Sequence, residues 1–107
     1  MDKTLKSIPP QNMDKKQILL TLAQHKSELK EMGVESIALF GSYARDTASP
    51  DSDVDLLVEL KEPKYLLLLQ ITDYLTELLG RKVDLIRKGP HLKPRFLEAV
   101  EKDLYYV

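Results

Sequence analysis

A Gly-Ser pair and three aspartates are the residues whose types and spacing could do chemistry. Gly41-Ser42 follows the apolar run 36–40, and Asp53-x-Asp55 comes after ten intervening residues. A glycine lets the backbone approach an anion closely, and amides at a helix start form, with a serine hydroxyl, an anion-binding corner. Carboxylates are the oxygen ligands that Mg²⁺ prefers. The combination predicts phosphate bound beside a divalent metal.

The alternation of residues 53–60 predicts where these carboxylates point. One alternate set must face the core, namely Val54, Leu56, Val58 and Leu60. Asp53 and Asp55 therefore lie on the opposite face, together with Leu57 and Glu59. The same reasoning places Asp84, in strand 82–86, away from the core. If the two strands are neighbours, three carboxylates share one face, where they repel unless a cation compensates. Alternate strand residues are about 6.6 Å apart and can converge on two Mg²⁺ ions about 3.5–4 Å apart.

Arg45 is a further candidate, because it lies one helical turn beyond the Gly-Ser pair. It could contact phosphate or brace the acidic loop. The alternative is a structural ion pair with Asp46 or Asp51, and the sequence leaves this choice open.

A calcium-binding loop is a competing interpretation of the acidic segment. Positions 1, 3, 5 and 12 of such a loop would be Asp51, Asp53, Asp55 and Glu62. Its sixth position needs glycine for a sharp turn, whereas the chain has Leu56 there. Because the run 56–58 is typical of a strand, we reject this interpretation.

The elements that must position these residues make an α+β domain. Asp14 and Gln17 have capping-box spacing, and Met13 and Ile18 have hydrophobic-staple spacing. The first helix therefore begins here and ends at Gly33, with these residues on its apolar face: Ile18, Leu22, His25, Leu29 and Met32. We interpret the histidine as a boundary residue with one polar edge in water rather than as a ligand. Strands 36–40, 53–60 and 82–86 and helices 65–79 and 95–102 follow, with a short helix expected after the Gly-Ser pair. They predict one small sheet covered on one face by helices.

The helix predicted over 65–79 has a core face and two leucines outside it. The core face holds Leu67, Leu68, Ile71, Leu75 and Leu78, and Gly80 closes the helix. Leu66 and Leu69 lie off this arc, either as ordinary exposed leucines or as part of a partner or dimer interface.

Composition bounds the class of protein. The 107 residues make one domain, with residues 1–12 as a tail and 13–107 as the folded unit. Hydrophobic residues make up 43% and charged residues 31%, which favours a globular chain. There is no cysteine, and neither a signal peptide nor a run of about 20 apolar residues is present, so we expect a cytoplasmic protein without a membrane span. The net charge of −1 disfavours strong nucleic-acid binding, and we interpret the basic stretch 87–95 as a solvated loop.

The segment GSYARDTASPDSDVDLLVEL resembles the signature of the polymerase-beta-type nucleotidyltransferases, and more narrowly is similar to the minimal nucleotidyltransferases (MNT or MntA proteins) of prokaryotes. The likeness is strongest over residues 37–60 and continues more weakly through KVDLI to the LYYV end. The resemblance implies a mixed sheet of three or slightly more strands and nucleotidyl transfer from ATP with two Mg²⁺ ions.

The resemblance also implies roles for individual residues and a partner. Ser42, with Gly41, would bind the triphosphate, while Asp53 and Asp55 would hold the metals. Asp84 would complete the site and take the proton from the attacking hydroxyl. MNT proteins act as antitoxins that add AMP to a tyrosine of a HEPN-domain ribonuclease toxin.

The chain departs from the family pattern at one position. Glycine is usual after the Ala-Arg pair, whereas this chain has Asp46. Aspartate tolerates left-handed backbone better than most residues, so we expect the turn to survive.

Two other functions remain open from the sequence. One is a binding-only antitoxin that blocks its partner by contact, and the other is a transferase acting on a small molecule. The short chain disfavours the second, since such enzymes resemble this core plus a substrate-binding domain. The acceptor and the homo- or hetero-oligomeric state are likewise open.

Overall fold

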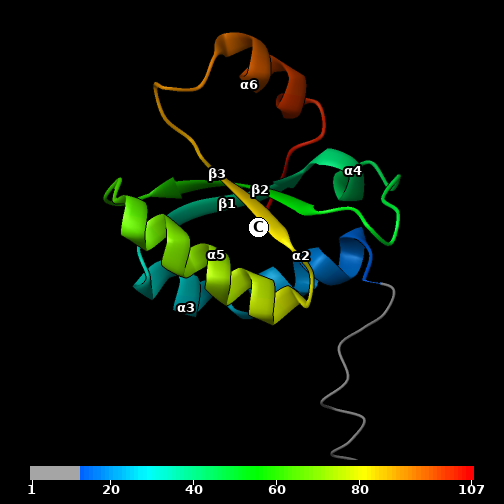
Figure 1. Ribbon diagram of the computed structural model, residues 1–107, viewed down its shortest axis with the longest axis horizontal. Coiled ribbons are helices and arrows are strands. Elements are labelled where there is room, and N and C mark those ends of the chain that lie inside the picture. Colours follow the sequence, from blue (N-terminus) through cyan, green and yellow to red (C-terminus); the bar gives the residue numbers. More distant parts are fainter. Residues whose placement is uncertain (1–12) are drawn as a thin grey trace, which may run out of the picture.

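The computed structural model describes residues 13–107, so the predicted tail 1–12 lies outside the described residues. Its helices and strands, labelled in Figure 1, follow one another as α2 (Lys15–Gln24), α3 (Lys26–Glu31), β1 (Val34–Phe40), α4 (Gly41–Ala44), β2 (Val54–Leu60), α5 (Tyr65–Leu79), β3 (Val83–Arg87), α6 (Pro94–Glu101) and β4 (Tyr105–Tyr106). The predicted α+β class and the short helix after the Gly-Ser pair are confirmed.

The sheet has four strands in the order β3-β2-β1-β4. β2 pairs antiparallel with β1 and parallel with β3, and α5 makes the crossover that a parallel pair requires. β4 adds a two-residue antiparallel edge beside β1. The sheet is therefore mixed, as the family resemblance implied, and slightly larger than three strands because the C-terminal residues join it.

Helices lie on both faces of the sheet, whereas the sequence predicted a cover on one face only. Figure 1 shows α2, α3 and α5 together on one side and α6 on the other. The first group covers the main core, whose fully buried side chains include Ile18, Leu22, Leu29, Leu56, Ile71 and Leu75. On the second face, α6 brings Val100 to Phe40 and Leu57 in a smaller apolar cluster. The sequence predicted this helix over 95–102 but not the face of the sheet that it covers, because its apolar contacts lie across several elements.

The first helix begins as predicted but is broken at His25 into α2 and α3. The capping box is present: Gln17 N–H donates to Asp14 Oδ1 at 2.9 Å, and Asp14 N–H donates to Gln17 Oε1 at 3.3 Å. At His25 the backbone turns to φ −111°, ψ 18°. Its ring Nδ1 lies 3.0 Å from Thr21 O, while its backbone N–H donates to Leu22 O at 3.2 Å. The ring thus takes the carbonyl that the amide would use in a continuous helix, and the amide makes the shorter turn instead. The interpretation as a boundary histidine is consistent with this contact.

Helix α5 has the predicted bounds and the predicted stop. Gly80 has φ +65°, and its N–H donates to Thr76 O at 3.0 Å. Leu79 is buried more deeply than Leu78, which the sequence had placed in the core face. Leu66 and Leu69 are exposed as predicted, at 72% and 43%. Within residues 13–107, no helix has the length and apolar character that crossing a bilayer requires.

Candidate active site

The predicted site residues meet at one end of the sheet because β1, β2 and β3 are in register there. Phe40, the last residue of β1, is paired with Asp55, and Asp55 is paired with Asp84 on β3. Neighbouring strands are about 4.8 Å apart, and paired residues point to the same face. Asp53 directly precedes β2 and is partly buried. The structure therefore brings the three aspartates together at one end of the sheet.

This row lies on the face opposite the main core, as the alternation predicted. Val54 and Leu56, which flank Asp55, are both completely buried beneath α2 and α5. Leu57, which has the same parity as Asp55, packs instead into the small cluster under α6. The carboxylates therefore share their face with α6, and Asp84 is exposed on it.

Gly41 lies directly against Asp55. Its φ of +79° is in the left-handed region that favours glycine. A Cβ atom at this position would overlap Asp55 Oδ2 and lie 2.9 Å from Asp55 Cγ. Only a residue without a side chain lets the turn and the carboxylate approach each other this closely. The Gly-Ser turn and the aspartates are thus parts of one site.

The electrostatics of Asp55 show that the three carboxylates act on one another. Burial raises the pKa of Asp55, repulsion from Asp84 and Asp53 raises it further, and the positive charge of Arg45 partly offsets these effects. The ionised form of Asp55 is therefore disfavoured in the protein on its own. A cation between the carboxylates would reverse this balance.

The donor set suits Mg²⁺, which is bound through carboxylate oxygens and keeps part of its shell for water and phosphate. Among residues 13–107, no three His, Cys, Asp or Glu side chains converge in a geometry that could hold a metal ion as they lie. Binding a cation therefore requires the carboxylates to change rotamer, which a partly buried and an exposed aspartate can do.

Arg45 is close enough to lower the pKa of Asp55, but its ion-pair partner is neither of the two that the sequence suggested. Its Nη1 lies 3.4 Å from Asp103 Oδ2, in the segment after α6. Asp46 instead pairs with Lys15, at 3.4 Å between Oδ2 and Nζ. The suggested pairs of Arg45 with Asp46 or Asp51 are therefore wrong. Arg45 instead contacts a residue near the C-terminus, and Asp46 contacts one at the start of α2.

Two residues that the sequence missed border this turn. Asp103 pairs with Arg45, and Tyr105 lies under the Lys15 ammonium, which is 4.5 Å from the ring centroid. Both are far from the turn in sequence, so no local spacing could have revealed them. For Tyr105 the available signal was the family likeness that continues to the LYYV end.

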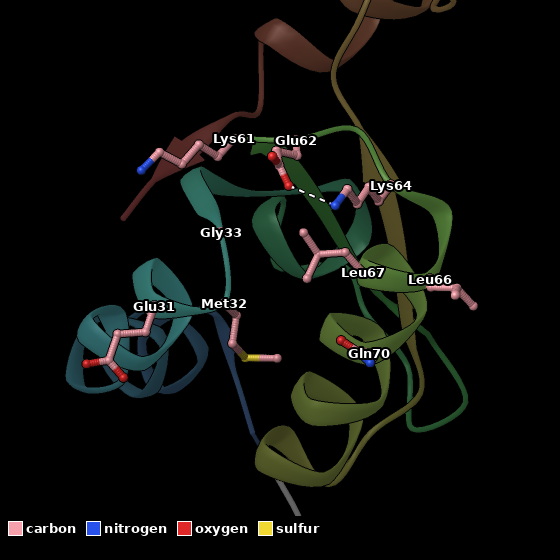
Figure 2. Close-up of a pocket in the computed structure, with 9 residues that line it drawn as sticks. All are labelled: Glu31, Met32, Gly33, Lys61, Glu62, Lys64, Leu66, Leu67 and Gln70. Atoms are coloured by element: carbon pink, nitrogen blue, oxygen red, sulfur yellow. Dashed lines mark ion pairs between the residues drawn. The ribbon is translucent and has the colours of Figure 1, made fainter.

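An apolar cleft between α3 and α5 is separate from these residues. Figure 2 shows Met32, Leu66 and Leu67 lining this space of about 390 Å³, with Lys64 paired to Glu62 at its rim. It lies at the end of β2 where Leu60 leads into the loop, whereas Asp55 is at the beginning. The seven residues of β2 put about 20 Å between the two ends. We assign the chemistry to the acidic end, because the two carboxylates that line the cleft, Glu31 and Glu62, lie among lysines, and Glu62 is paired with Lys64.

Comparison with known proteins places this geometry in a family. A family model described as a nucleotidyltransferase domain matches residues 22–106. The chain is 50% identical over 88 residues to a Methanocaldococcus jannaschii protein that carries the provisional name of protein adenylyltransferase, covering 80% of this chain and 90% of that one. A solved structure, described provisionally as a minimal nucleotidyltransferase, is 31% identical with a TM-score of 0.75, covering 89% of this chain and 97% of that one.

A more distant structure shares the fold. It is described as a tri-AMPylated Shewanella oneidensis HEPN toxin in complex with MNT antitoxin, and it matches with a TM-score of 0.60 at 18% identity, over 83% of this chain and 70% of that one. The family match spans both the Gly-Ser turn and the carboxylate row, and the 31% identical structure extends over nearly the whole chain. The chain therefore belongs to the nucleotidyltransferase domain family, among its minimal members, and is a nucleotidyltransferase.

Proposed function

We propose that this nucleotidyltransferase transfers AMP from ATP to a hydroxyl of a partner protein. The partner is a HEPN-domain ribonuclease toxin, the acceptor is one of its tyrosines, and the chain acts as its antitoxin. The observation that carries the proposal is the row formed by Asp55 and Asp84, with Gly41 packed against Asp55. This arrangement puts the Gly-Ser turn within contact distance of a carboxylate whose charge is only partly offset by Arg45.

In this proposal the three aspartates and the Gly-Ser turn have separate roles. Asp53, Asp55 and Asp84 hold Mg²⁺, and Gly41 and Ser42 bind the triphosphate. When bound, the metal supplies charge neutralisation at the phosphates and orients the nucleotide. The raised pKa of Asp55 supports this role, because its environment contains two further carboxylates and only a partial offset from Arg45.

The transfer step is a displacement at the α-phosphorus. The acceptor oxygen forms a bond to the α-phosphorus while the bond from that phosphorus to the oxygen bridging it to the β-phosphate breaks, so pyrophosphate leaves with the bonding electrons. The acceptor proton passes to Asp84, the most exposed of the three carboxylates. Most of the rate enhancement then comes from positioning and charge stabilisation rather than from covalent participation of the protein.

Two observations support a protein acceptor. The relative from Methanocaldococcus jannaschii carries the name of protein adenylyltransferase, and the Shewanella oneidensis complex pairs an MNT antitoxin with an AMPylated HEPN toxin. In this chain α6 packs over Leu57, further along β2, while Asp84 remains exposed. A large acceptor can therefore reach the carboxylates and cover the side of the site that this chain leaves exposed. Because ATP is the donor, we place this activity in the cytoplasm.

The test is transfer of label from α-³²P-ATP with Mg²⁺ in lysate of the source cell, using the wild type and Asp53→Asn. Circular dichroism confirms that the variant is folded. We expect a labelled protein band with the wild type alone, and sequencing of the labelled peptide to place AMP on a tyrosine.

Other outcomes identify the rival functions. Label on a small molecule would indicate a small-molecule transferase. If no label appears with folded protein and toxin present, and Asp53→Asn still neutralises the toxin in cells, the chain is a binding-only antitoxin and the catalytic proposal is wrong.

A further inference from the structure

Two consecutive residues after α4 tie the Gly-Ser turn to other parts of the chain. Arg45 pairs with Asp103, as described above. Asp46 pairs with Lys15 at 3.4 Å, and the same ammonium lies 4.5 Å from the centroid of the Tyr105 ring. Lys15, at the start of α2, therefore contacts both the turn that contains Asp46 and the C-terminal strand β4.

The backbone of this turn is one that normally selects glycine. Asp46 has φ +59°, its N–H donates to Tyr43 O at 3.2 Å, and Thr47 N–H donates to Ser42 O at 2.9 Å. These two bonds form a Schellman motif, in which the left-handed position is usually glycine. An aspartate in this conformation is strained relative to glycine. It supplies, however, a carboxylate that pairs with Lys15, and glycine has no side chain to do so.

The contacts hold the Gly41-Ser42 segment from both sides. On its N-terminal side, Tyr105 is paired in register with Leu39 of β1, two residues before the glycine. On its C-terminal side, the turn that contains Asp46 is bonded to the Ser42 carbonyl. Lys15 connects these two sides, so a displacement of either would stretch its contact with the other.

We propose that Lys15, Asp46 and Tyr105 form a clamp, here called the turn clamp, that positions Gly41-Ser42 to bind the triphosphate. The three act as positioning residues, since none of them lies in the row of carboxylates. The inference rests on the proposed function in one respect: the triphosphate must bind at the Gly-Ser turn. The backbone at position 46 thus tolerates aspartate, and the Asp46 side chain holds the turn through its ion pair with Lys15.

The test measures nucleotide affinity separately from chemistry and from stability. Calorimetry with α,β-methylene-ATP and Mg²⁺ gives the affinity, because the carbon bridge prevents cleavage at the α-phosphorus. Steady-state AMP transfer gives KM and kcat, and thermal unfolding gives stability. The variants are Lys15→Met, Asp46→Gly and Tyr105→Leu, with Lys15→Arg as the conservative change. Lys64→Met is the matched control, because Lys64 also forms an exposed ion pair, 3.1 Å from Glu62, but at the distant cleft.

We expect each clamp variant to weaken binding of the analogue and raise KM for ATP by about three- to tenfold, the range that a lost ion pair and cation–π contact would give. The control Lys64→Met keeps wild-type affinity, and Lys15→Arg retains most of it. The Lys15→Met, Asp46→Gly double variant loses less than the product of the two single losses, because both break the same contact. Asp46→Gly is the decisive single variant, since glycine suits the left-handed backbone and the turn itself should persist.

Wild-type affinity in folded Lys15→Met and Asp46→Gly would overturn the clamp, as would an equal loss in Lys64→Met. A loss that occurs only in variants that are partly unfolded at the assay temperature would also overturn it. By contrast, failure of the wild-type protein to bind the analogue or to transfer AMP would contradict the proposed function itself.

Discussion

Replacing Gly41 by alanine tests whether the glycine turn and the carboxylate site are one unit. The substitution changes two things at once. It places a side chain on backbone at φ +79°, and it directs the new Cβ into Asp55 Oδ2, with Asp55 Cγ only 2.9 Å away. Contacts this short do not persist, so either the turn or the carboxylate must move.

The magnitude follows from these two effects. Left-handed backbone costs an alanine about 1–2 kcal/mol relative to glycine. Pushing the Asp55 side chain away from its rotamer costs about 0.5–1.5 kcal/mol more. The free energy of unfolding should thus fall by about 1.5–3.5 kcal/mol, which lowers Tm by about 10–15 °C at the middle of that range. A displacement of about 1 Å at the reacting groups is expected to reduce AMP transfer on the order of a hundredfold.

Thermal unfolding and AMP transfer are measured side by side, with Gly80→Ala as the control. Gly80 ends α5 at φ +65°, so alanine there meets a similar backbone strain without overlapping Asp55. We expect Gly80→Ala to lower the free energy of unfolding by about 1–2 kcal/mol and to keep its transfer activity. In an Asp55→Ala background, the cost of Gly41→Ala should drop toward the same value, because the overlapping oxygen is gone.

The reasoning is refuted if Gly41→Ala destabilises no more than Gly80→Ala and still transfers AMP at the wild-type rate. It is refuted equally if the cost of Gly41→Ala is the same with and without the Asp55 carboxylate. Either result would mean that the two groups do not constrain each other.

Three further predictions follow from the site and the core. Because burial and repulsion raise the pKa of Asp55 above its usual 3.8, the ionised group weakens the fold at neutral pH. Without Mg²⁺, Asp55→Asn should therefore have a higher Tm than the wild type at pH 7. This Tm difference should shrink as the pH falls through the raised pKa of Asp55 and vanish below pH 3.8. A Tm difference that stays constant across this pH range would contradict the prediction. Mg²⁺ at a hundred times its Kd should raise the free energy of unfolding of the wild type by about 2.7 kcal/mol, and its Tm should rise accordingly. In the same melts, Mg²⁺ should raise the Tm of Asp55→Asn much less. Finally, Leu75→Ala, at a fully buried position of α5, should cost about 2–5 kcal/mol. Leu66→Ala, 72% exposed on the same helix, should cost less than about 0.5 kcal/mol in denaturant titrations.

The parity of the strands could be predicted from the sequence because it depends on a rigid period of two. Val54, Leu56 and Val58 had to face the core, so Asp55 had to point away from it, whatever the rest of the fold did. The capping box at Asp14 was equally predictable, since both of its hydrogen bonds span three residues. Local spacing determines such features before any tertiary contact forms.

Features that depend on distant residues could not be predicted in this way. The in-register pairing of Asp55 with Asp84 requires knowing that β2 and β3 are neighbours and parallel. The break at His25 depends on which group takes the Thr21 carbonyl, and helical periodicity does not distinguish these states. The partner of Arg45 lies 58 residues away, so the turn's own sequence offered only nearby aspartates as alternatives.

The two faces of the sheet explain how so small a domain tolerates three neighbouring carboxylates. The main core under α2, α3 and α5 contains the largest fully buried side chains, whereas in the cluster under α6 the buried residues of the described part of the chain are Phe40, Leu57 and Val100, each of which keeps some exposure. Most of the apolar burial, and hence most of the stability, comes from the face that carries no aspartate. The opposite face can thus hold repelling charges and remain accessible to a substrate. This division predicts opposite signs for the same experiment: neutralising Asp55 strengthens the fold and removes activity, whereas truncating Leu75 weakens the fold and affects activity only through unfolding.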